Sequence, residues 1–249
     1  MLPNLITLSS VFCGFYAILL CSKDATEDDF YRAALLIVYA MFFDTLDGRV
    51  ARLTKTQSAL GVQLDSLADV ISFGVAPAAL VYRWSLESLG VMGLLACFAY
   101  VSCGTIRLGR FNVLTMGESG APKAPSKYII GLPIPAAAGI VVSLVVANHS
   151  VAGHLPQASV AVLAVMLLLG ACMVSTIRFR SFKDIQLSPR TVLFVVFAVG
   201  STTFVALRFH GAFALVWLLS SYVAIGLVEA IFNVSRRTMR RARGRDNGA

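Results

Sequence analysis

Charged side chains are scarce in this chain of 249 residues. Aspartate, glutamate, lysine and arginine together make up 14% of it, whereas soluble domains carry about 25%. Hydrophobic residues reach 57% and the mean hydropathy is +0.78. So little charge excludes an ordinary soluble domain, whose surface needs many more polar groups to face water. We therefore expect the lipid bilayer to be the solvent of this chain.

Cysteine is also rare, and no two cysteines have the CxxC spacing of a thiolate metal site. The pattern supports neither such a centre nor a disulfide framework, so we expect small apolar residues within helices. The N-terminus lacks the basic region and the cleavage site of a secretory leader, so we expect the first apolar run to be retained. The cysteines are Cys13, Cys21, Cys97, Cys103 and Cys172.

Long apolar runs are what the chain has in abundance. A transmembrane helix needs about 20 mostly apolar residues, and eight segments qualify if acids are tolerated in the second and third. We predict an all-α, polytopic transmembrane bundle in one membrane domain over residues 1–235, followed by a basic cytoplasmic tail over 236–249. The predicted spans are residues 4–22, 30–53, 59–82, 88–108, 128–147, 158–177, 190–208 and 211–233.

Lysine and arginine are distributed unevenly among the predicted connectors. If the N-terminus lies inside, 17 of the 21 basic residues fall on the inner side. Basic residues near span ends are retained in the cytoplasm, so we expect both termini there, in the cytoplasmic membrane of a bacterium or an archaeon. The arginine-rich tail can bind anionic lipid, but the ordinary inner-side bias of basic residues is the explanation that we favour.

Four aspartates interrupt the second and third apolar runs, where carboxylates are rare and usually functional. Asp44 and Asp47 are three residues apart, and Asp65 and Asp69 are four apart. Each pair therefore lies on one face of its helix. With a turn near residues 55–58, Asp47 and Asp65 both lie about 10–12 Å from it along their helices. We expect all four carboxylates to meet at one depth, near the cytoplasmic end.

Four like charges at one place require cations or protons. Oxygen ligands favour Mg²⁺, Mn²⁺ or Ca²⁺ over zinc, and four acids fit two ions, a common arrangement in phosphoryl chemistry. Gly48, Ala51 and Gly61 leave room for a bulky ligand, and Arg52 can meet a phosphate or extend to lipid headgroups. The alternatives for the acids are a structural ion-pair cluster and an ion-conduction path.

The spacing of these residues, D-x2-D-G-x2-A-R-x8-G-x3-D-x3-D from Asp44 to Asp69, resembles the signature of the CDP-alcohol phosphotransferase family at each fixed position. The resemblance implies a membrane enzyme that attacks a CDP-linked lipid with an alcohol and releases CMP. It implies that Asp44, Asp47 and Asp65 bind metal, and that Asp69 completes a two-ion site and is the general base. The residues that it places along the CDP are Gly48, Ala51, Arg52 and Gly61.

Five further segments resemble the CDP-diacylglycerol–serine O-phosphatidyltransferase branch of this family, from the start of the chain to about Asp184. This resemblance implies transfer of the phosphatidyl group from CDP-diacylglycerol to the hydroxyl of L-serine, which forms phosphatidylserine. It implies membrane lipids and a second copy of the chain, in a homodimer, as partners, and no nucleic acid. The chain departs from the branch at Gly109, where we expected alanine. The segments are PNLITLSSVFCGFYAI, GVQLDSLADVISFGVAPA, RLGRFNV, GLPIPAAAG and MVSTIRFRSFKD.

A serine acceptor needs a cation for its carboxylate, and arginine offers a bidentate fork. Each basic residue on the metal side can serve, or can extend to lipid headgroups instead. Asn112 can receive the amine, and Asn4 and Thr7 can contact the nucleotide or cap the first helix. On a helix, Arg178 and Arg180 cannot share a face, so only one is expected to reach serine. The basic candidates are Arg107, Arg110, Lys123, Lys127, Arg178 and Arg180.

Two kinds of alternative to serine transfer remain open. The first kind keeps the family and changes the acceptor to a glycerol phosphate, to an inositol compound, or to serine with an archaeal-type lipid. The second kind lies outside the family: a cation or proton transporter whose path is formed by the aspartates, or a lipid-scaffolding protein. A transporter predicts acids spread through the depth of the bilayer, whereas these acids gather at one end, and a scaffold has no need of four acids.

Overall fold

The computed structural model describes residues 2–54, 56, 58–115, 128–150, 159–180, 217 and 221. This part of the chain is helical, as predicted, with one short antiparallel ribbon that was not predicted. The elements are α1 (Leu2–Leu20), α2 (Glu27–Leu53), α3 (Ala59–Asp69), the π-helical η1 (Val70–Val75), α4 (Ala76–Val81), η2 (Tyr82–Leu86), η3 (Glu87–Leu89), α5 (Val91–Thr115), β1 (Tyr128–Ile130), α6 (Ile134–Ser150), α7 (Ser159–Val174) and β2 (Arg178–Arg180).

Three helical stretches in the described ranges are long and apolar enough to cross a membrane: Leu2–Leu20, Ala59–Leu89 and Val91–Leu114. The apolar helices α6 and α7 are shorter, and α2 is long but begins with three acids. The chain is therefore a membrane protein. The predicted spans at 190–208 and 211–233 lie, apart from Trp217 and Ser221, outside the described residues, as does the basic tail.

Side-chain caps set where the two acid-bearing helices begin. The hydroxyl of Thr26 accepts the N–H of Asp29 at 3.3 Å, and the Asp29 carboxylate accepts the N–H of Thr26 at 3.0 Å. This reciprocal pair satisfies donors that a helix start leaves free. At the start of α3, the Ser58 hydroxyl accepts the N–H of Gly61 at 3.0 Å. The Ser58 cap thus starts α3 directly after the turn that the sequence predicted near residues 55–58.

The third predicted span, residues 59–82, is not one regular α-helix. The backbone becomes π-helical directly after Asp69 and then returns to an α-helix at α4. Because Pro77 has no N–H, the carbonyl of Phe73, four residues earlier, lacks its usual helical donor. The buried hydroxyl of Tyr100 on α5 donates to that carbonyl at 3.1 Å. A side chain of the neighbouring helix α5 therefore supplies a hydrogen-bond donor to the segment that follows Asp69.

The helix α1 approaches η1 closely because residue 14 is glycine. A Cβ added at Gly14 would lie 2.9 Å from the Cα of Ser72, which is closer than real Cβ atoms come. The Ser72 hydroxyl donates to the carbonyl of Ser10 at 3.0 Å, and the Ser10 hydroxyl lies 3.3 Å from the Ser72 hydroxyl. These contacts hold α1 beside the segment that follows the aspartates of α3.

The fifth predicted span, residues 128–147, begins as a strand and not as a helix. The strand β1 pairs antiparallel with β2, about 50 residues further along the chain. Gly131 then takes a φ of +78°, a conformation that glycine adopts without strain. The residue before Pro133 is also biased away from the helical region, so α6 begins only at Ile134.

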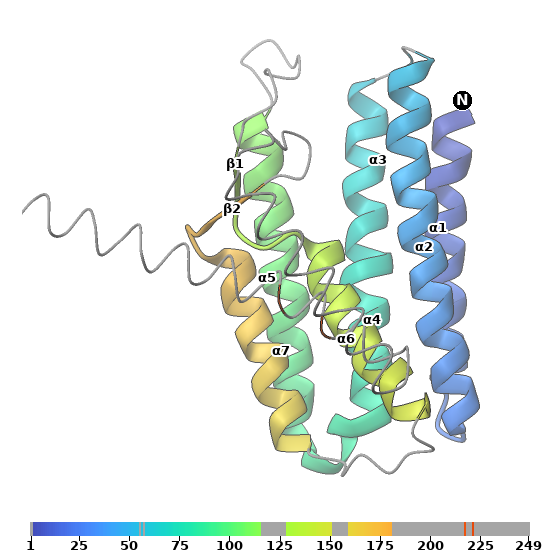
Figure 1. Cartoon of the computed structure of the whole chain (residues 1–249), viewed down its shortest axis with the longest axis vertical. Coiled ribbons are helices and arrows are strands. Elements are labelled where there is room, and N and C mark those ends of the chain that lie inside the picture. The colour runs from blue at the N-terminus through green and yellow to red at the C-terminus, as the bar shows by residue number, and fades with distance from the viewer. Residues whose placement is uncertain are drawn as a thin grey trace, which may run out of the picture.

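Figure 1 shows the N-terminus, the connection between α2 and α3, the C-terminal end of α5 and the ribbon at the same end of the bundle. The connection between α1 and α2 lies at the opposite end. There His149 of α6 stacks on Tyr31 and places its Nε2 3.0 Å from an oxygen of Asp28. The C-terminal parts of α2 and α5, which contain Arg52 and Arg110, therefore lie at one end of the bundle, as the charge distribution predicts for basic residues on a common side.

Candidate active site

Three of the four aspartates come together between α2 and α3. Oxygens of Asp44, Asp47 and Asp65 all lie within 4.8 Å of one another. The side chain of Asp47 is buried, and the other two are half-buried. Carboxylates this close repel one another unless a cation or a proton lies among them. The helical spacing predicted this meeting, and the structure brings these three residues together.

The fourth aspartate, Asp69, lies beside this cluster. Its carboxyl group is in hydrogen-bond contact with that of Asp44. Its Oδ1 is buried and has no hydrogen-bond partner in the part of the chain that the structure describes. A buried carboxylate oxygen rarely goes without a partner, and an oxygen-binding cation would supply one. The four acids therefore fit a divalent metal, which favours oxygen ligands.

The first helix reaches this cluster through two polar side chains. The hydroxyl of Thr7 donates to Asp47 Oδ2 at 2.5 Å, so α1 and α2 meet at a metal-ligand candidate. Asn4 lies one turn earlier, and its Oδ1 would be 3.7 Å from a Cβ added at Gly61. Both residues were predicted as nucleotide contacts, and the structure places both beside the acid-bearing helices.

Open space lies beside the acids on α2. A Cβ added at Gly48 would have no atom within 4 Å of it outside its own neighbourhood. Ala51 is half-buried one turn further on, and Arg52 is exposed at the end of the helix. These positions leave room next to Asp47 for a bulky ligand, with a cation at its rim.

Among the basic candidates in the described ranges, Arg107 is the one whose charge acts on an aspartate of the site. Its side chain is 6% exposed on α5 and interacts electrostatically with Asp69. The guanidinium also lies over the ring of Phe111, 5.2 Å from the centroid. A buried arginine beside carboxylates is stable only with such partners. It is therefore well placed to meet a second anion that enters the site.

Asn112 contacts the acid-bearing helix through a residue that the sequence did not single out. Its Nδ2 donates to the hydroxyl of Ser66 at 2.8 Å. Ser66 lies between Asp65 and Asp69 in the sequence, and its hydroxyl donates to the carbonyl of Val62 at 3.1 Å. The position of Ser66 between two acids was its only signal, because serine is common in helices without any role.

Arg110 bonds to the end of another helix. Its Nη1 donates to the carbonyl of Val174 at 3.1 Å and its Nη2 to that of Ser175 at 3.0 Å. The last carbonyls of a helix lack intrahelical donors, and a nearby cation satisfies them. The guanidinium thus joins the C-terminal end of α7 to α5. Its predicted contact with serine stays a prediction.

Two of the remaining basic candidates belong to the short ribbon. Arg178 and Arg180 belong to β2, opposite Ile130 and Tyr128 of β1. The backbone there is extended, so the premise that these two arginines lie on a helix is wrong, and which of them reaches serine stays a prediction. The reason is the strand partner 50 residues away, which no local pattern reveals. Lys123 and Lys127 lie outside the described residues.

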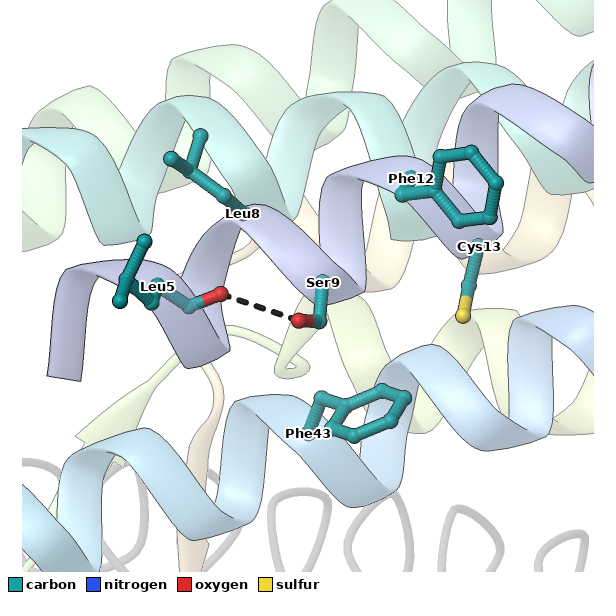
Figure 2. Close-up of a pocket in the computed structure, with 6 residues that line it drawn as sticks. All are labelled: Leu5, Leu8, Ser9, Phe12, Cys13 and Phe43. Carbon is teal, nitrogen blue, oxygen red and sulfur yellow. Dashed lines mark hydrogen bonds between the residues drawn. The ribbon is translucent and has the colours of Figure 1, made fainter. Parts of the chain in front are cut away.

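An apolar groove of about 500 Å³ lies between α1 and α2 and opens to the surface. Figure 2 shows side chains from both helices around it. They are Leu5, Leu8, Ser9, Phe12, Cys13 and Phe43. The groove has no carboxylate in its lining, so it is not the place of the chemistry. Most of the neighbouring exposed side chains of α1 are large and apolar, as a surface in contact with acyl chains would be.

The chain matches known proteins over most of its length. It is 39% identical over 197 residues to the CDP-diacylglycerol–serine O-phosphatidyltransferase of Helicobacter pylori, a match that covers 78% of each chain. It is 34% identical over 187 residues to the Bacillus subtilis protein of that name, which covers 73% of this chain and 91% of the relative. A Methanocaldococcus jannaschii protein of the same name is 34% identical over 198 residues, or 80% of each chain.

The family model described as CDP-alcohol phosphatidyltransferase matches residues 1–177. This range holds α1 to α7, and so it contains the four aspartates and the helices that position them. The match extends well beyond half of the chain. The chain therefore belongs to the CDP-alcohol phosphatidyltransferase family.

Proposed function

We propose that the protein transfers the phosphatidyl group of CDP-diacylglycerol to the hydroxyl of L-serine and releases CMP, which forms phosphatidylserine. The observation that carries the proposal is the group of carboxylates of Asp44, Asp47 and Asp65 within the helical bundle. Membership of the family supplies the reaction class. Relatives from two bacteria and an archaeon that bear the name of this activity support serine as the acceptor.

The acid cluster is proposed to hold two divalent ions, Mg²⁺ or Mn²⁺. Asp44, Asp47 and Asp65 are the ligands, and Asp69 completes the site from the buried side. Bound there, the ions supply positive charge to the diphosphate oxygens and to the departing CMP. Gly48 and Gly61 keep side chains away from the space beside them, so that the nucleotide can approach the backbone of α2 and α3.

Asp69 is the proposed general base. Serine's hydroxyl oxygen attacks the phosphorus that carries the diacylglycerol, and its proton moves to the carboxylate of Asp69. The bond between that phosphorus and the oxygen of CMP breaks, so one P–O bond forms as another is lost. Asp69 suits this role because its Oδ1 is buried without a partner in the described ranges and lies close to Asp44.

Arg107 is the best-placed residue for the serine carboxylate. It is buried on α5 beside Asp69, and a guanidinium binds a carboxylate through two parallel hydrogen bonds. Asn112 lies five residues further along the same helix and is proposed to contact the amine. A carboxylate held at Arg107 would bring the hydroxyl of serine toward the proposed base.

The proposed arrangement in the membrane follows from charge. The acid cluster faces the cytoplasm, both termini lie there, and the domain of residues 1–235 contains eight spans with a basic tail after it. The C-terminal parts of α2 and α5, with Arg52 and Arg110, lie at one end of the bundle, which supports this orientation. A homodimer in a bacterial or archaeal cytoplasmic membrane is the proposed assembly.

One assay tests the proposal. Purified protein in lipid nanodiscs receives CDP-diacylglycerol and, separately, serine, glycerol 3-phosphate, inositol or inositol phosphate, and the release of CMP is measured. We expect release with serine in the presence of Mg²⁺ or Mn²⁺. Release with glycerol 3-phosphate and none with serine would leave the family in place and refute the acceptor. The absence of release with every alcohol would refute the reaction.

A further inference from the structure

One hydroxyl of α1 contacts the acid cluster directly. Thr7 and Asp47 are 40 residues apart in the sequence, and each side chain is 5% exposed. The Oγ1 of Thr7 lies 2.5 Å from Asp47 Oδ2 and 3.1 Å from the carbonyl oxygen of Pro3. A threonine hydroxyl has one proton to donate. The shorter contact, to an acidic group, is the stronger of the two.

This hydrogen bond restricts a side chain that would otherwise rotate. Oxygens of Asp47, Asp44 and Asp65 lie within 4.8 Å of one another, and the repulsion among these acids favours rotation of the Asp47 carboxylate away from the shared centre. A donor from a second helix opposes that rotation. Thr7 is itself held in place, because α1 packs against η1 through Gly14 and Ser72.

We propose that Thr7 is a positioning residue, which holds the carboxylate of Asp47 in the orientation that binds a divalent cation. The inference rests on the metal role of Asp47 in the proposed function. It gives α1 a part in the metal site, although α1 has no acidic residue. It also differs from the contact between Thr7 and the nucleotide that the sequence predicted.

The expected size of the effect follows from known metal sites, where residues that hydrogen-bond to a metal ligand also influence metal affinity. Their loss typically reduces metal affinity or activity about 10- to 100-fold, because the ligand loses its orientation and some of its basicity. Thr7→Val removes the hydroxyl and keeps the branched shape, whereas Thr7→Ser keeps the hydroxyl. Thr105→Val is the matched control, because the Thr105 hydroxyl also bonds to the carbonyl four residues earlier but is exposed on α5.

The experiment measures Mn²⁺ binding directly, by electron paramagnetic resonance of the purified full chain in nanodiscs, without substrate. We expect the Mn²⁺ Kd to rise about 10- to 100-fold in Thr7→Val. It should stay close to wild type in Thr7→Ser and Thr105→Val. In an Asp47→Asn background, Thr7→Val should have little further effect, since its partner can no longer act as a charged ligand.

Several results would overturn the proposal. Unchanged Mn²⁺ affinity in Thr7→Val, with a raised KM for CDP-diacylglycerol, would make Thr7 a nucleotide contact. An equal loss in Thr7→Ser would show that the missing methyl group and not the hydroxyl matters. If Thr7→Val does not remain monodisperse, Thr7→Ala gives the same comparison. Wild-type protein that binds no Mn²⁺ would refute the metal role itself, whereas normal binding with serine-independent CMP release would refute only the acceptor.

Discussion

Removal of the Tyr100 hydroxyl tests how the helix after the aspartates is held together. Tyr100 is fully buried, and its hydroxyl donates to the carbonyl of Phe73 at 3.1 Å. That carbonyl lacks the usual α-helical donor, because the residue four positions later is Pro77. Tyr100→Phe therefore leaves a buried carbonyl without a partner and creates almost no cavity. We expect a loss of unfolding free energy that comes from the hydrogen bond alone.

The size of this loss can be bounded from both sides. Double-mutant cycles on hydrogen bonds in membrane proteins average about 0.6 kcal/mol and reach about 1.7. An orphaned buried acceptor costs about 1–3 kcal/mol. Because Phe73 is buried and Pro77 has no N–H that could replace the hydroxyl, we expect about 1–2 kcal/mol, at the upper end of the membrane values.

The assay is reversible unfolding by SDS in mixed micelles. Tyr16→Phe is the matched control, because Tyr16 loses the same atom on the exposed face of α1, and its unfolding free energy should hardly change. Pro77→Ala restores an N–H that can donate to the Phe73 carbonyl. In that background the cost of Tyr100→Phe should fall. An equal cost with and without Pro77 would refute the reasoning, as would a negligible cost of Tyr100→Phe alone.

Three further predictions concern the site. CMP release should require a divalent cation and stop in EDTA, and Asp47→Asn should reduce it by orders of magnitude, as should asparagine at each of the other three aspartates. Reporters placed after Asp24 and Gly153 should be accessible only from outside, and tags at both termini only from the cytoplasm. Arg107→Ala should raise the KM for serine about 10- to 100-fold, the value of one buried charge-assisted contact, and change the KM for CDP-diacylglycerol little.

Each of these has a clear contrary outcome. Full turnover in EDTA, or near-normal activity of Asp47→Asn, would show that the acid cluster is not a metal site. An externally labelled C-terminus would mean an odd number of spans. Wild-type serine kinetics in Arg107→Ala would show that another residue binds the serine carboxylate. If serine amide is a good acceptor, no cation is needed to bind that carboxylate.

The sequence by itself determined the acid cluster. The intervals between Asp44 and Asp47 and between Asp65 and Asp69 match the helical repeat, and that repeat follows from backbone geometry alone. A short connection between two apolar runs then makes the helices antiparallel neighbours. The helical class and the membrane environment follow from composition for a similar reason, because a bilayer leaves few ways to satisfy the backbone.

The tertiary structure decided everything that depends on partners far apart in the chain. Three contacts join residues that are 40 to 65 positions apart. They are the hydrogen bond from Thr7 to Asp47, the hydrogen bonds from Arg110 to carbonyls at the end of α7, and the pairing of β1 with β2. Local patterns predict which face a side chain lies on, but not which helix packs against that face. The same limit hid the hydrogen bond from Tyr100 of α5 to the carbonyl of Phe73 in the π-helical segment. These contacts depend on how the helices and strands pack against one another, and no spacing in the sequence predicts that packing.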